Sequence, residues 1–451
     1  MSDMDYMGIA ELYCWVGHMP WLDWRTGHEV EDCLQAHLNC GIRDVAWKLG
    51  RSVVEFHTDL PRATLFDGVG HPEPWGRELG KVFAERCCLR AALEFAEKNG
   101  MRLYGRLGMN RHYSKEAYGG CFTSKWAAEH EEFHEVTREG GVDPSRLCYA
   151  FEEVRQERVD LLVEAARIGV EGLQLDFCRQ PPMARYHPRL VEGFRQATGL
   201  EALDLDPWEP DCRAGACTPP AVVTAHTAAG YKPSPCSGGG NAFRQWISYR
   251  ASFITQMLRD LHAALEPLRR ETGRAIPVQA RVPDNGLDVD LMAGLDVTTW
   301  FAEGLVQELS VSSLNWLADF QEHDLRPYVE LGKQYGVKVL GGVNALAIQR
   351  VSGVLPGPEE INPVRLAERA LRQYEEGAQG MTLYQSDFAV WPEELREVIA
   401  LLGEPEALAR FAADEGNRRR WPTTYKNLVY GVDNHGNPRG QYHMPGREPG
   451  V

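Results

Sequence analysis

The sequence predicts an α/β protein built as a (β/α)8 TIM barrel with long loops on its C-terminal face. Short apolar, β-rich runs alternate with amphipathic helical runs, which is typical of parallel strands joined by crossover helices. Eight such units follow one another along the chain. The fourth strand, in the segment VEGLQLDFCRQPP, ends on a carboxylate, Asp176. Because active sites of such barrels lie at the carboxyl ends of the strands, we expect Asp176 at the floor of a site.

Glycines mark the helix ends in the first half of the chain. Gly41, Gly100 and Gly169 each follow an apolar stripe at three- and four-residue spacing. Each glycine also precedes a short apolar run that we expect to form the next strand. The expected strands are residues 7–16, 42–48, 101–107 and 170–176, and the expected helices are residues 29–39, 81–98 and 153–168.

The second half resumes the alternation after an interruption at residues 200–241, which are rich in Asp, Pro, Gly and Cys. We interpret this stretch as a surface insertion. Asn241 is a good N-cap for the long apolar-striped helix that follows and ends at Gly273. The remaining expected strands are residues 276–282, 306–311, 337–343 and 380–384; the remaining helices follow Pro188 and Pro363 and cover residues 297–303, 325–335 and 393–402.

The chain is longer than the barrel alone requires. Such barrels need roughly 250 residues, whereas we expect this one to use residues 1–403. The surplus lies in loops after the second, third, fourth and seventh strands, on the face where substrate would bind. Long loops on one face indicate a deep or extended cleft. Residues 404–451 are expected to form a short appendage packed on the barrel.

Charge and composition exclude several function classes. The net charge of −16 disfavours binding to nucleic acid and to anionic membranes. No apolar run is long enough to cross a bilayer, and the N-terminal residues lack the pattern of a signal peptide. Eleven cysteines, an odd number, fit reduced thiols in a cytoplasmic protein. No pattern indicates an oligomeric state.

Four segments together resemble bacterial family-10-like glycosyl-hydrolase-like proteins. They read VEGLQLDFCRQPPMARYHP, CYAFEEVRQERVDLLVEA, QWISYRASFITQMLRDLH and GLDVTTWFAEGLVQEL. The similarity covers most of residues 7–403 and omits the insertion and the tail. It implies a (β/α)8 barrel distantly akin to amylase-type glycosidases, with carbohydrate as the substrate class. The expected function is therefore hydrolysis of an oligosaccharide or glycoside.

Two aspartates are the expected catalytic pair, since glycoside hydrolysis usually needs two carboxyl groups. Amylase-like enzymes keep a nucleophilic Asp after the fourth strand, so the resemblance gives Asp176 the role of nucleophile or base. Their acid, normally Glu, follows the fifth strand, where this chain has Asp284 in QARVPDNG. Both have structural alternatives: an ion pair with Arg179 for Asp176, and an Asp-Asn-Gly turn for Asp284. Glu11 and Asp387 are the reserve carboxyls.

Polar and aromatic residues near the other strand ends are expected to bind the sugar. Cations are frequent there, and each of them is also a plausible partner for a loop carboxylate. Trp15 is expected to stack on a sugar ring. The expected substrate-binding residues are Trp15, Lys48, Arg51, Arg106, Arg179, Arg281, Asn344, Tyr384 and Asp387.

Two other classes stay open, a barrel that binds carbohydrate without cleaving it and a metal-dependent hydrolase. Residues 130–134 read HEEFH, which matches the HExxH zinc signature, but the surrounding sequence is mostly polar and lies in a loop. Cys212, Cys217 and Cys236 match no standard zinc module. No nucleotide-binding glycine motif is found, so we expect neither a metal nor a cofactor.

Overall fold

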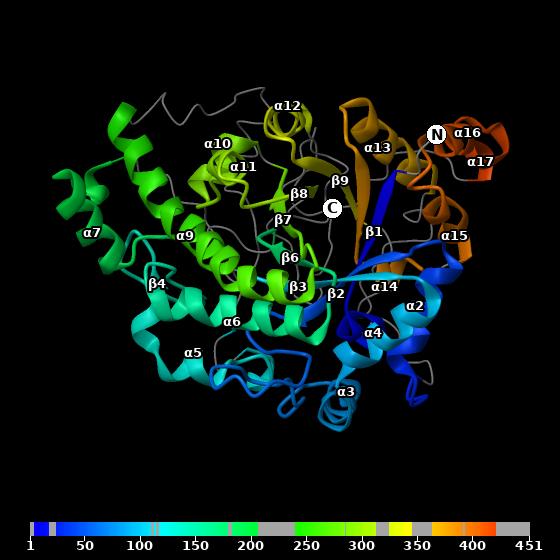
Figure 1. Cartoon of the computed structure of the whole chain (residues 1–451), viewed down its shortest axis with the longest axis horizontal. Coiled ribbons are helices and arrows are strands. Elements are labelled where there is room, and N and C mark those ends of the chain that lie inside the picture. The colour runs from blue at the N-terminus through cyan, green and yellow to red at the C-terminus, as the bar shows by residue number, and fades with distance from the viewer. Residues whose placement is uncertain are drawn as a thin grey trace, which may run out of the picture.

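The computed structural model describes residues 4–17, 24–109, 112–113, 117–178, 183–205, 240–284, 286–312, 324–344, 363–390 and 393–420. Eight parallel strands close into a barrel in the order β1-β10-β9-β8-β7-β6-β3-β2, with helices around them (Figure 1). This confirms the predicted (β/α)8 fold. The barrel strands are β1 (Asp5–Ala10), β2 (Asp44–Gly50), β3 (Arg102–Gly108), β6 (Gly172–Asp176), β7 (Val278–Pro283), β8 (Glu308–Ser312), β9 (Lys338–Asn344) and β10 (Gly380–Tyr384).

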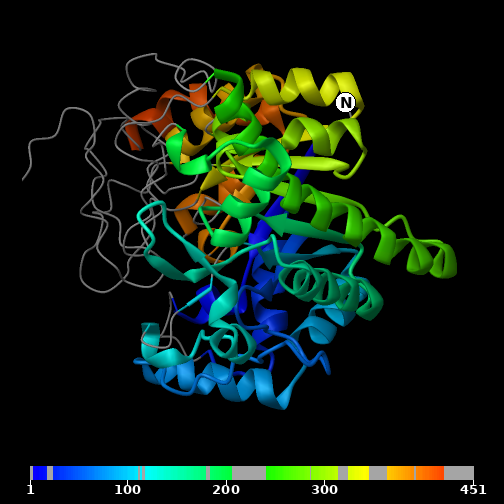
Figure 2. The same cartoon turned by 90° about the vertical axis from the view of Figure 1, so that its left-hand side faces the viewer.

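The helices surround the barrel, and the long α9 runs alongside α6 (Figure 2). Glycines with positive φ end several of them, such as Gly100 after α4 and Gly336 after α12. The longer helices are α2 (Glu29–Asn39), α3 (Pro74–Glu85), α4 (Cys88–Asn99), α6 (Glu152–Ile168), α7 (Pro188–Thr198), α9 (Gly240–Thr272), α12 (Arg326–Tyr335), α13 (Pro363–Glu375), α15 (Glu393–Ala400) and α16 (Pro405–Ala413).

Shorter helices and strands lie in the loops. The loop after β3 contains an antiparallel hairpin, β4 (His134–Val136) and β5 (Val142–Leu147), which the sequence did not lead us to expect. The short helices are α1 (Leu12–Gly17), α5 (Lys125–Glu129), α10 (Leu287–Met292), α11 (Val297–Ala302), α14 (Ser386–Ala389) and α17 (Glu415–Arg420), with 3₁₀ turns at Ala117–Gly120, Glu131–Phe133 and Ala202–Asp204.

Two predicted elements were wrong in their extent. The first strand was expected over residues 7–16, but β1 ends at Ala10 and α1 begins at Leu12. The run is apolar at nearly every position, and such a run does not distinguish strand from helix. The helix expected over residues 81–98 is divided into α3 and α4, because Arg86 between them adopts an extended backbone.

The C-terminal part of the described chain packs on the barrel. Helix α16 contacts α13 and buries Leu408 and Phe411. It lies beside the N-terminus of the chain in Figure 1, and therefore at the end of the barrel opposite the carboxyl ends of the strands. None of the helices in the described ranges is both long enough and apolar enough to cross a membrane.

Candidate active site

The candidate site is built from the last inward-facing residue of several barrel strands. Alternate residues of a barrel strand face the interior. Met7, Ile9, Ala46, Tyr104 and Tyr384 form a buried cluster of their own inside the barrel. Two residues further along the same inward faces lie Glu11, just after β1, Lys48 in β2 and Arg106 in β3. Asp176 ends β6, and Arg281 lies near the end of β7. We call this group, together with Arg51 after β2, the mouth network.

Asp176 is held between two arginines. Its Oδ2 accepts from Nη1 of Arg106 at 2.8 Å and its Oδ1 from Nη1 of Arg281 at 2.9 Å. The backbone amide of Cys178 also donates to Oδ1, at 3.1 Å. Asp176 is only 1% exposed. A carboxylate this deeply buried requires such partners, since an isolated charge would be strongly destabilising.

Glu11 is the most heavily bonded carboxylate of the mouth. Its Oε2 lies 2.8 Å from Nη2 of Arg106, 3.1 Å from Nζ of Lys48 and 3.3 Å from Nη2 of Arg51. The thiol of Cys14 donates to Oε1 at 2.5 Å. Burial alone would raise the pKa of Glu11, but the three positive charges outweigh it and hold the pKa well below its usual range.

Arg106 brings the two carboxylates together. One of its terminal nitrogens binds Asp176 and the other binds Glu11, both at 2.8 Å. Because the two nitrogens belong to one planar guanidinium, the bound carboxylate oxygens are no more than about 8 Å apart. An upper limit of this size is compatible with the carboxyl separations found in glycosidases.

The remaining cations of the mouth network are also paired. Lys48 donates to Glu55 at 2.5 Å as well as contacting Glu11, and burial and the charge of Glu11 raise the pKa of Glu55. Arg281 donates to Oγ of Ser312 at 3.0 Å. Its guanidinium also lies 4.1 Å from the centre of the Tyr384 ring, which is close enough for a cation–π contact. Each cation of the mouth network therefore has at least one carboxylate partner.

Asp387 lies next to this network, in α14 just beyond β10. It is fully buried, and burial followed by the charge of Glu11 raises its pKa well above the usual range, against the opposing charge of Arg106. Glu11 and Asp387 thus form a pair of carboxyl groups whose pKa values are moved in opposite directions. Such pairs are found where one group must be charged and the other neutral.

Asp284, the second predicted catalytic residue, directly follows β7 and is half-buried. Its charge raises the pKa of Asp290 and of Tyr328, so these two side chains are its electrostatic neighbours. Among the residues that the structure places, no hydrogen bond or ion pair joins Asp284 to the mouth network. The structure therefore joins Asp176 to Glu11 through Arg106.

Three other predicted binding residues have different outcomes. Trp15 was expected to stack on a sugar ring, but it lies in α1 and is only 5% exposed. Asn344 is the last residue of β9, and its side chain is outside the described part of the structure. Arg179 and the cysteines at 212, 217 and 236 also lie outside the described residues.

The HEEFH segment does not form the helix that the zinc signature requires. Helix α5 ends at Glu129, a 3₁₀ turn follows, and His134 begins β4. His130 is bonded to Oε1 of Glu132 at 2.8 Å, and Nε2 of His134 to the carbonyl of Ala127 at 3.1 Å. The two histidines therefore do not share one helix face, and this pattern gives no support to a zinc hydrolase.

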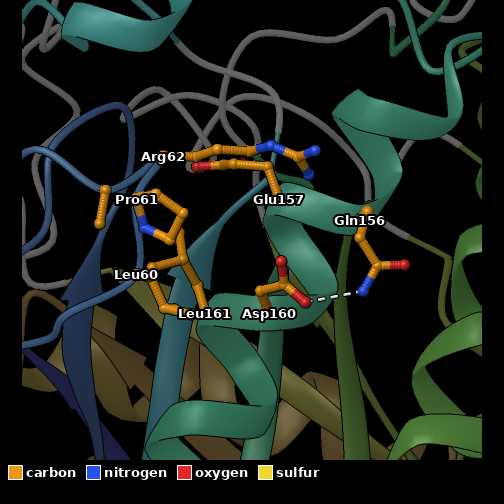
Figure 3. Close-up of a pocket in the computed structure, with 8 residues that line it drawn as sticks. Leu60, Pro61, Arg62, Gln156, Glu157, Asp160 and Leu161 are labelled. Atoms are coloured by element: carbon orange, nitrogen blue, oxygen red, sulfur yellow. Dashed lines mark hydrogen bonds between the residues drawn. The ribbon is translucent and has the colours of Figure 1, made fainter.

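A cavity of about 200 Å³ lies outside the barrel, between α6 and the loop after β2 (Figure 3). Its polar groups are satisfied locally: Gln156 donates to Asp160 at 2.7 Å, and Glu157 accepts from Arg158. No predicted site residue lines it. Arg158 links this wall to the mouth, because it donates to the carbonyl of Arg51 at 2.6 Å.

Sequence reasoning missed several contributors. Glu11 was placed inside a strand and held only in reserve, although it continues the inward-facing alternation of Met7 and Ile9. Glu55 lies in a loop after β2 and no local signal marks it. Cys14 and Ser312 were also missed, since their roles depend on contacts with Glu11 and Arg281 that arise only in three dimensions.

Comparison with known proteins identifies no family. No family model matches the chain, and no curated protein matches it. Among solved structures, a β-galactosidase from the psychrophilic Marinomonas ef1 is 12% identical with a TM-score of 0.49; the match covers 90% of this chain and 60% of that one.

Two further solved structures show the same degree of similarity. A catalytic mutant of a GH42 β-galactosidase from G. stearothermophilus is 12% identical with a TM-score of 0.48, covering 91% of this chain and 57% of its own. A glycoside hydrolase family 18 N-acetylglucosaminidase from Paenibacillus barengoltzii is 10% identical with a TM-score of 0.42, covering 89% and 100%. With every score below 0.5, the activity of this chain does not follow from theirs; the strand order itself establishes the barrel.

Proposed function

We propose that this protein is a glycoside hydrolase that cleaves an oligosaccharide or a glycoside at the mouth of the barrel. The observation that carries the proposal is the carboxylate pair Asp176 and Glu11, joined through Arg106 and no more than about 8 Å apart. The carbohydrate class rests on the sequence segments that resemble family-10-like glycosyl-hydrolase-like proteins.

The contacts suggest different roles for the two carboxylates. Arg106 and Arg281 stabilise the charged form of Asp176, the form that attacks the anomeric carbon or activates water. Glu11 already accepts from three cations and a thiol, so it is a poor nucleophile. Its negative charge would instead stabilise the positive charge that develops on the sugar ring. The sequence analysis assigns the proton donor to Asp284.

One observation favours a second function, a barrel that binds carbohydrate without cleaving it. Asp176 is 1% exposed, and both of its carboxylate oxygens are bound to arginine. A buried ion network of this kind also serves structure alone. The two functions differ in whether bound sugar is hydrolysed.

The test is a screen of aryl glycosides and oligosaccharides against the wild-type protein and Asp176→Asn. We expect the wild type to release product, and we expect Asp176→Asn to lower kcat by about 10³-fold or more, because the reactive carboxylate is lost. The matched control is Asp143→Asn. Asp143 is a partly buried carboxylate that is also held by two arginines, Arg146 at 2.5 Å and Arg185 at 2.7 Å, but outside the mouth.

Thermal unfolding of both variants separates damage to the fold from damage to the chemistry. Retained turnover in a folded Asp176→Asn would reject its catalytic role. Binding of a sugar by the wild type with no cleavage of any compound in the panel would establish the second function.

A further inference from the structure

We propose that Asp387 is the proton donor of this site, in place of Asp284. The inference rests on the proposed glycoside hydrolase activity and names the residue that protonates the leaving oxygen. It is carried by the way the segment after β10 is built around this carboxyl group.

The backbone at Gln385 turns Asp387 into its position. Gln385 follows the last residue of β10 and has a φ of +55°, in the left-handed region that a residue with a long side chain rarely adopts. It is 2% exposed, so this conformation is held by surrounding structure. Strained residues persist where the fold over-determines them, and they are concentrated at active sites.

Ser386 anchors the same turn on the barrel. Its Oγ is hydrogen-bonded to Nε2 of His37 in α2 at 2.9 Å. Gly8 of β1 makes the close approach possible, because a Cβ there would lie 2.7 Å from Oγ of Ser386. The segment is therefore fixed on both sides of Gln385, and Asp387 is held beside Glu11 with little freedom.

The carboxyl group of Asp387 has few hydrogen-bond partners for its depth. It is 0% exposed, and no side chain in the described part of the chain donates to either of its oxygens; the polar groups beside them are the backbone amides of Glu11 and of Asp387 itself. The Oε1 of the neighbouring Gln385 has no hydrogen-bond partner among the described residues. Buried polar atoms are nearly always paired in folded proteins, so such sparse bonding at the end of a barrel strand calls for a functional explanation.

The groups around Asp387 keep its carboxyl group protonated. Burial and the negative charge of Glu11 raise its pKa, while Arg106 and the nearby amides of Glu11 and of Asp387 itself only partly oppose them. The thiols of Cys14 in α1 and Cys33 in α2 also face it, and both thiols have raised pKa values, so they are neutral. Asp387 is thus a neutral acid next to a charged network, as a proton donor must be.

The proposed step moves one proton and one electron pair. The proton of Asp387 passes to the glycosidic oxygen as the bond from that oxygen to the anomeric carbon breaks, and the electron pair stays on the oxygen. The leaving group departs as a neutral alcohol. Water replaces it at the anomeric carbon and releases one proton, which restores the starting protonation of the enzyme.

The decisive experiment compares leaving groups in Asp387→Asn. The probes are the phenyl and the 2,4-dinitrophenyl glycosides of the sugar that the wild-type protein hydrolyses. Phenolate needs protonation in order to leave, so we expect kcat/KM for the phenyl glycoside to fall about 10³-fold. Dinitrophenolate leaves without help, so its kcat/KM should fall less than about tenfold.

Asp290→Asn is the matched control. Asp290 is another fully buried carboxyl whose pKa is raised by burial, but it lies in α10 and is bonded to Tyr328 at 2.8 Å. The same substitution there should not make the rate depend on the leaving group. Asp284→Asn is measured in parallel, since it is the competing donor.

Gln385→Gly provides a test that does not alter any carboxyl group. Glycine adopts a positive φ without strain, so the variant leaves the backbone before Asp387 less constrained. We expect it to lower kcat for the phenyl glycoside more than for the dinitrophenyl glycoside, because Asp387 is held less firmly.

Each outcome bears on one claim. An active wild type with an unaffected Asp387→Asn would overturn the inference alone, as would a leaving-group effect in Asp284→Asn. A wild type that hydrolyses no glycoside would overturn the proposed function and the inference with it. If Asp387→Asn does not fold, the selective loss in Gln385→Gly decides.

Discussion

Asp387 shows how a side chain suited to proton donation lowers the free energy of unfolding. Its pKa is raised well above the usual value, so the native protein keeps a proton that the unfolded chain releases. The free energy of unfolding must therefore fall as pH rises from about 3.9, the pKa of an unperturbed Asp, toward the raised value. The residue that we propose as the donor should be a source of instability at neutral pH.

Replacing Asp387 by Asn should make the protein more stable at pH 7. Asn mimics the neutral acid and removes the proton linkage, so we expect a gain in the free energy of unfolding at pH 7 that disappears near pH 4. Chemical denaturation at several pH values measures it. A variant less stable than wild type at pH 7 would contradict this expectation.

At the scale of single residues, the sequence predicted the positions of those mouth residues that follow from strand alternation. Asp176, Lys48, Arg106 and Arg281 all lie on inward faces near strand ends, and local pattern alone gives that position. Pairing does not follow from local pattern. Asp284 is as close to its strand end as Asp176 is to its own, yet its electrostatic neighbours are Asp290 and Tyr328.

At the scale of elements, the hairpin of β4 and β5 is the least expected feature. Its strands are short, and the Gly140–Gly141 turn with its polar neighbours reads as loop in the sequence. Glu135 of β4 is fully buried, and its carboxyl group lies beside the backbone amides of Arg185 and Val136. Burial raises the pKa of Glu135 to about 7, although the amides of Arg185 and Val136 and the charge of Arg250 oppose the shift.

This hairpin should make stability depend on pH. The native Glu135 keeps its proton up to about pH 7, whereas the unfolded chain loses it near pH 4.3, so the free energy of unfolding falls between these values. Glu135→Gln should remove this slope and leave the variant about 2–4 kcal/mol more stable at pH 8. Glu132→Gln, at an exposed glutamate three residues earlier, is the control. A wild type and Glu135→Gln with parallel pH curves would contradict the prediction.

The strand and helix boundaries show where sequence periodicity is sufficient. The strand at residues 380–384 coincides with β10, and the other barrel strands after the first lie within two residues of their predicted ends. The errors at residues 7–16 and 81–98 have a shared cause, since in both stretches the element is interrupted by tertiary contacts and not by a change in local periodicity. At Arg86, for example, a bond to Glu31 accompanies the extended backbone that separates α3 from α4.

At the scale of the whole molecule, the two ends of the barrel differ in what they contribute. The mouth holds the charged network, while α16 packs on α13 at the opposite end and buries Leu408 completely. In these barrels the face at the carboxyl ends of the strands usually carries the chemistry, and the opposite face contributes stability. Substitutions in α16 should therefore change stability without changing turnover.

Leu408→Ala tests this separation. The loss of a fully buried leucine should lower the free energy of unfolding by about 2–4 kcal/mol. We expect kcat below the unfolding temperature to stay at the wild-type value, and Arg410→Ala on the exposed face of α16 to change neither quantity. A large fall in kcat for folded Leu408→Ala would show that the two ends are coupled.

The bridge formed by Arg106 has a consequence for how this chain can diverge. Removing its guanidinium alone would leave two buried anions without a shared counter-ion, and removing either anion alone would leave part of its positive charge unmatched. Single replacements at Glu11, Arg106 or Asp176 are thus each more damaging than a joint replacement by neutral residues. Descendants of this sequence should retain the three together or lose them together, and double-mutant cycles would register that interdependence as strong non-additivity.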